Sequence, residues 1–65
     1  MILISSNLEA YQYDKEMQVL HVRFRGGGLT SYRDVPEDVA AGLGTADSPG
    51  KYFHGKIKND FRVLW

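Results

Sequence analysis

Cationic and aromatic side chains are the residues of this sequence whose types and spacing most readily suggest chemistry. They fall in two expected strands and one expected helix: Arg23, Arg25, Tyr32, Lys51, Tyr52, His54 and Lys58. A cationic groove holds the phosphates of a single-stranded nucleic acid, and aromatic rings give its bases a surface for stacking. A plainer interpretation stays open, in which Tyr32 and Tyr52 border the core and the cations only solvate the surface.

The segment Ser48-Pro49-Gly50-Lys51 also has two interpretations. A helix start offers unpaired N–H groups to an anion, and Lys51 would add positive charge. The glycine spacing and the following Ser or Thr of a P-loop are missing. Ser48 as the cap of a helix, with Pro49 at its first position, is the simpler interpretation and the one that we favour.

We expect no catalytic activity from this chain. His21 and His54 are its two histidines, and neither has a spacing that pairs it with a nucleophile. Ser5 and Ser6 lack the elbow motif of hydrolases that use a serine nucleophile. No cluster of His, Cys and acidic residues has metal-ligand spacing, so neither a metal nor a cofactor is expected.

Three strands are predicted, over 8–13, 19–25 and 29–33. They must position Arg23, Arg25 and Tyr32. In the second strand, Leu20, Val22 and Phe24 alternate with three polar residues, which predicts one apolar and one cationic face. The first strand alternates imperfectly. The segments 14–16 and 26–28 are suited to turns, so the three strands should form an antiparallel meander.

Two short helices are expected to follow. Pro36 ends the third strand and suits the first turn of a helix, and Val39, Leu43 and Ala46 share one helical face. In the second helix Phe53 and Ile57 should face the core, which leaves Lys51, His54 and Lys58 as a polar stripe.

A final strand over 61–65 is predicted at a sheet edge, because Phe61, Val63 and Trp65 alternate with other residues. The predicted fold class is therefore α+β: a three-stranded antiparallel meander, two short helices and a C-terminal strand. We expect one domain over 1–65.

Composition bounds the function. The chain has 65 residues, 43% of them apolar and 25% charged, with no cysteine and a formal net charge of zero. The charge is uneven, because residues 1–47 carry four basic and seven acidic side chains, and residues 48–65 carry four and one. A neutral chain is a poor candidate for tight, sequence-independent nucleic-acid binding. The apolar run 1–4 is too short for a signal peptide or a membrane span, so a cytoplasmic protein without membrane contact is expected.

The sequence resembles the KTSC domain family, named for a module at the C-terminus of some lysyl-tRNA synthetases and also found alone in small bacterial and phage proteins. The resemblance runs from Ser5 to Phe61. It rests on Ser5-Ser6-Asn7, Tyr13-Asp14, the Leu20/Val22/Phe24 strand, the glycine turn, Tyr32 with Val35-Pro36, Ala46-x-Ser48-x-Gly50-Lys51-Tyr52-Phe53 and Ile57-Lys58.

Three positions depart from the family pattern. Thr30 stands where the first residue of a Tyr-x-Tyr pair is usual, His54 where Asn is frequent, and Gln12 where Gly is common. The synthetase context implies RNA as a partner. We therefore expect a non-catalytic binding module for RNA. The alternative is an interaction or inhibitory module that binds a protein partner, a small anionic ligand or a second copy of itself, with Tyr11 and Trp65 as interface anchors.

Overall fold

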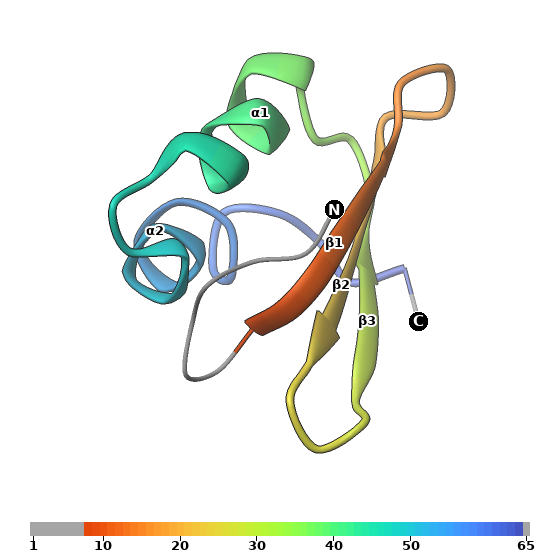
Figure 1. The fold of residues 1–65 in the computed structure, drawn as a ribbon. Coiled ribbons are helices and arrows are strands. Elements are labelled where there is room, and N and C mark those ends of the chain that lie inside the picture. Colours follow the sequence, from red (N-terminus) through yellow and green to blue (C-terminus); the bar gives the residue numbers. More distant parts are fainter. Residues whose placement is uncertain (1–7, 65) are drawn as a thin grey trace.

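The structure is a computed structural model and describes residues 8–64, so the predictions that concern Ser5, Ser6 and Trp65 lie outside the described residues. Within residues 8–64, three strands precede two helices (Figure 1). The elements are β1 (Leu8–Asp14), β2 (Val19–Phe24), β3 (Leu29–Tyr32), α1 (Glu37–Thr45) and α2 (Pro49–Lys56). The strands form one antiparallel sheet in the order β1-β2-β3, which confirms the predicted α+β meander followed by two helices.

Polar side chains and glycines form the two hairpin turns. After β1, the Asp14 Oδ1 accepts the backbone N–H groups of Glu16 at 3.1 Å and Met17 at 3.2 Å, which is how aspartate initiates a turn. After β2, Gly26 and Gly27 both have φ of +98°. Side chains other than hydrogen are strained in that conformation, so glycine suits this turn.

A β-bulge in β1 explains the imperfect alternation of the first strand. Leu8 pairs with Phe24 and Ala10 with Arg23, so one extra residue, Glu9, is inserted between them. The insertion exchanges the two faces for the residues that follow. Leu8 is therefore fully buried, and Tyr11 reaches the core side farther along the same strand.

Both helices cover the same face of the sheet (Figure 1). α1 begins after Pro36, with two acidic residues in its first turn, and buries Ala40 and Leu43. α2 begins at Pro49 after the cap Ser48, as predicted.

The core lies between the helices and the sheet. Phe53 of α2 is 2% exposed and meets Phe24 and Tyr32 edge to face, with ring centroids 5.5 and 5.6 Å away. Ile57 is fully buried, so the predicted inward face of this helix is confirmed.

Of the predicted C-terminal strand over 61–65, the described residues 61–64 form one isolated bridge, between Tyr32 and Val63. The Arg33 N–H donates to the Arg62 carbonyl at 3.0 Å, and the Leu64 N–H donates to the Ser31 carbonyl at 2.6 Å. β3 has four residues, and the C-terminal segment meets only its last part, so the ladder does not extend. None of the helices in the described part of the chain is long and apolar enough to cross a membrane.

Candidate ligand-binding site

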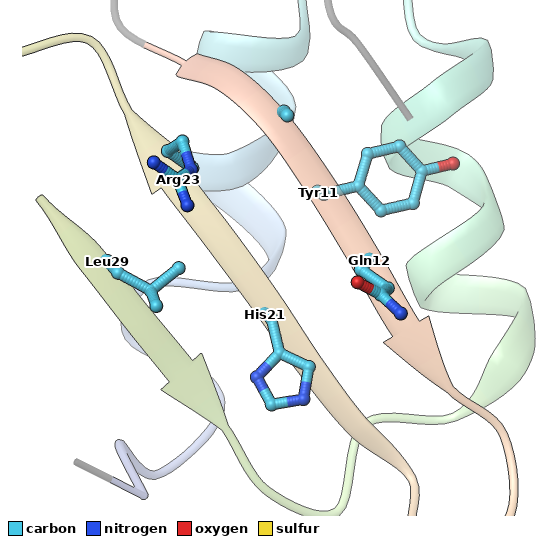
Figure 2. A pocket seen from close by; sticks show the side chains of 6 residues that line it. Tyr11, Gln12, His21, Arg23 and Leu29 are labelled. Carbon is cyan, nitrogen blue, oxygen red and sulfur yellow. The ribbon is translucent and has the colours of Figure 1, made fainter. Parts of the chain in front are cut away.

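The face of the sheet opposite the helices carries the candidate site. We call it the outer face, and define it by the outward residues of the three strands. These are Ala10 and Gln12 of β1, His21 and Arg23 of β2, and Leu29 and Ser31 of β3. A cavity of about 450 Å³ opens on this face, lined by all of these residues except Ser31, and also by Tyr11 (Figure 2).

Strand register determines which side chains surround Arg23 and His21 on the outer face. Arg23 pairs with Ala10 on one side and Leu29 on the other, and His21 pairs with Gln12 and Ser31. All four of these cross-strand neighbours are uncharged. The bulge, however, inserts Glu9 beside Ala10, so β1 sets two residues against Arg23, and one of them is acidic. The residues paired with His21 are both uncharged.

A short hydrogen bond sets the position of His21. Its Nδ1 lies 2.6 Å from the Oγ of Ser31, and Ser31 is fully buried although it is polar. A bond shielded from water in this way holds the imidazole in one orientation on the outer face. Figure 2 shows His21 and Arg23 standing over the same strand, with Leu29 beside them on β3.

Arg23 is exposed in the middle of the outer face. The two ion pairs recorded between described residues, Lys15–Glu37 and Arg33–Asp34, use other side chains. The methyl group of Ala10 is too small to cover the guanidinium, and Leu29, 50% exposed, supplies an apolar wall. Arg23 is thus placed to meet an anion that enters the cavity.

The predicted cations do not share one face. Phe53 and Ile57 point from α2 into the core, so Lys51, His54 and Lys58 lie exposed on the helical layer, on the other side of the molecule from Arg23. Arg25 is exposed in the turn after β2 and so lies beyond the cavity. Of the seven predicted site residues, only Arg23 lines the cavity.

The two predicted aromatic residues have structural positions. Tyr32 is 4% exposed and packs edge-on against Phe53, so neither ring face is open to a base, and burial raises its pKa. The Tyr52 Oη donates to the Val39 carbonyl at 2.8 Å, which ties α2 to α1. Burial, with a smaller effect from Asp38, raises the pKa of Tyr52.

The helix start at Ser48 acts as a cap. Its Oγ accepts the backbone N–H of Lys51 at 3.5 Å, as the simpler interpretation predicts. Within residues 8–64 no group of three or more His, Cys, Asp or Glu side chains could hold a metal ion.

Sequence reasoning missed Ser31, Leu29 and Gln12 as site residues. The signal that could have found them is hairpin register. A short glycine turn fixes which residue of β3 lies opposite His21, and that residue is Ser31.

Comparison with known proteins gives the same family at the level of sequence and of structure. The chain matches the KTSC domain over residues 4–61. It is 40% identical over 60 residues to a protein of Tsukamurella paurometabola, covering 92% of this chain and 90% of that protein. It is also 40% identical over 63 residues to an uncharacterised protein of Stutzerimonas stutzeri, covering 97% and 89%.

A longer relative contains a similar segment. A lysine–tRNA ligase of Nostoc is 39% identical over 57 residues, which is 88% of this chain but 10% of the ligase. The crystal structure of a KTSC domain protein from Yersinia pestis superimposes with a TM-score of 0.93 at 32% identity, covering 97% of this chain and 89% of that one. The chain therefore belongs to the KTSC domain family.

Proposed function

We propose that this chain is a non-catalytic binding module that holds a single-stranded segment of RNA on the outer face of its sheet. One observation carries the proposal: Arg23 and His21 stand over an open cavity on the face that the helices leave uncovered. An antiparallel sheet with one uncovered face presents cations and flat polar surface to an extended strand.

The relative that has a named activity also supports RNA as the partner. A lysine–tRNA ligase acts on tRNA, and the ligase of Nostoc carries a segment similar to this chain. RNA is therefore the nucleic acid that we favour as the partner.

The number of cations sets a modest affinity. Arg23 would neutralise one phosphate, so log K should fall with log salt concentration at a slope of about −0.7. This dependence is shallower than that of a strongly basic RNA-binding domain, in keeping with a net charge of zero.

Fluorescence anisotropy with a labelled single-stranded oligoribonucleotide tests the proposal. Arg23→Gln should abolish most of the binding and flatten the salt dependence. The double variant Lys51→Ala/Lys58→Ala, which removes two charges from the opposite side, should bind within about a factor of two of the wild type because solvated, distant charges are screened. Loss of binding in the double variant but not in Arg23→Gln would place the site on α2, and salt-insensitive binding would exclude this mechanism.

Exposed apolar side chains favour a protein partner as a second candidate. Leu29, Val63 and Leu64 are 50%, 55% and 43% exposed, and Leu64 lies beside Ser31 at the edge of the sheet. If the oligoribonucleotide does not bind, affinity purification with the wild type and a Leu64→Ser variant should identify a specific protein lost with the substitution.

A further inference from the structure

We propose that the outer-face cavity is a subsite for a single nucleotide, whose phosphate is held by Arg23 and His21 and whose sugar and base lie along the apolar wall at Leu29. The inference rests on the proposed function and makes it more specific, because it names the unit of RNA that the cavity recognises. It also assigns Ser31 a role as a positioning residue for His21.

The spacing of Arg23 and His21 suits one phosphate. Arg23 and His21 are two residues apart on β2 and point to the same face. Their Cα atoms are therefore separated by about 6.5 Å along the strand. A phosphate that sits between the two side chains can accept from the guanidinium and the imidazole together, whereas a carboxylate has fewer oxygens to share between them.

The cavity is large enough for more than an inorganic anion. Its volume of about 450 Å³ lies in the range of small-molecule sites. Leu29 supplies an apolar surface on one side of Arg23, and the amide of Gln12 offers both donors and acceptors on the other side of His21. A nucleotide combines the required groups: one phosphate, a flat heterocycle with hydrogen-bonding edges, and a sugar between them.

Ser31 holds His21 in the orientation that the phosphate needs. The 2.6 Å bond between Ser31 Oγ and His21 Nδ1 is formed by a serine with no exposed surface. Water therefore does not compete for the bond, and the imidazole cannot rotate without breaking it. Removal of the hydroxyl should leave the fold in place and release the ring, because only one oxygen atom is lost from the buried serine.

Titration of ¹⁵N-labelled protein with adenosine 5′-monophosphate, followed by amide chemical shifts, tests the subsite. Millimolar nucleotide should shift amides in 10–12, 21–23 and 29–31, and leave those of α2 unchanged. Arg23→Gln should weaken binding at least about tenfold, the loss expected for one charge-assisted contact. Lys51→Ala is the matched control and should bind as the wild type does.

Ser31→Ala should weaken binding several-fold and change the ¹⁵N shifts of the His21 ring, which report the loss of the bond at Nδ1. A purely structural role for Ser31 would alter stability and leave those ring shifts as they are. Unchanged His21 ring shifts in a folded Ser31→Ala variant would therefore overturn the assigned role.

The subsite can fail separately from the proposed function. Oligoribonucleotide binding that depends on Arg23, without amide shifts from the mononucleotide, would refute the subsite and keep RNA binding. Equal affinity for inorganic phosphate and for the nucleotide would reduce the cavity to an anion site and overturn the proposal. Failure of both the oligoribonucleotide and the mononucleotide to bind would refute the proposed function as well.

Discussion

Replacement of Gly42 by alanine should destabilise the domain, although alanine is the better helix former. Gly42 lies inside α1, directly beneath the ring of Tyr52 from α2. A Cβ at this position would lie 2.6 Å from the Tyr52 Cζ and closer still to its Oη. The ring would have to move away, because real Cβ atoms do not approach other atoms so closely.

The expected magnitude comes from three opposing effects. Alanine in place of glycine favours the helix by about 1 kcal/mol. Moving the ring breaks the 2.8 Å hydrogen bond from Tyr52 Oη to the Val39 carbonyl, which contributes about 1 kcal/mol. Inserting a methyl group into a filled contact costs roughly 1–3 kcal/mol. The free energy of unfolding should therefore fall by about 1–3 kcal/mol in total.

Urea and thermal unfolding followed by circular dichroism measure this loss. For a domain of this size the Tm should drop by roughly 4–8 °C for each kcal/mol. Gly55→Ala is the matched control, because a Cβ at Gly55 of α2 meets no atom within 4 Å. It should raise the stability by up to about 1 kcal/mol.

Repeating Gly42→Ala in a protein that lacks the Tyr52 ring tests whether the loss of stability comes from the contact between the two helices. In a Tyr52→Leu protein the outer atoms of the ring are gone, so Gly42→Ala should be neutral or stabilising there. If Gly42→Ala stabilises the wild type as much as Gly55→Ala does, the close packing of Tyr52 on α1 is refuted. The same result would leave Tyr52 available for the stacking role that its sequence context suggested.

Three further predictions concern the meander. Asp14→Ala should cost about 1 kcal/mol in urea unfolding, because the first turn loses the acceptor of two N–H groups; an unchanged midpoint would contradict this role. Gln18 has φ of +55°, so Gln18→Gly should raise the free energy of unfolding by up to about 1 kcal/mol. Gln18→Ala should give no such increase, because alanine is also strained at positive φ. Burial, and then the nearby Glu37, raise the pKa of Tyr13 above its ordinary value of 10.0. Its stabilising effect is therefore complete below pH 10.0 and is lost as the pH rises further, when the Oη can no longer donate to the Val35 carbonyl. The Tm of Tyr13→Phe should change less steeply across this range than that of the wild type.

Local patterns predicted most of the fold. The alternation around Leu20 and Val22 identified the central strand and its buried face, and Ser48 marked the start of α2 to the residue. The imperfect alternation of β1 could not be resolved from sequence, because a bulge depends on pairing with a partner strand. The C-terminal segment alternates as a strand does, but within residues 61–64, the part that the structure describes, it forms a single bridge to β3.

The site was harder to predict than the fold, for a physical reason. Cations on a strand and on a helix can be recognised from their own elements, but whether they meet depends on how the two layers pack. Phe53 turns α2 so that Lys51 points away from the sheet, and this could not be read from either segment alone. Tyrosine is equally ambiguous, since its ring suits a core and its hydroxyl suits a surface, as the position of Tyr32 illustrates.

The pairing of residues across β2 has a consequence for how relatives could diverge. Its successive side chains alternate between the core and the outer face, so Leu20 and Val22 pack in the core, whereas His21 and Arg23 lie on the outer face. Under the proposed function, substitutions of His21 and Arg23 would change what the outer face binds and would leave the core packing unchanged. A protein that superimposes closely on this chain at 32% identity can therefore keep the same architecture and differ in the residues of its outer face.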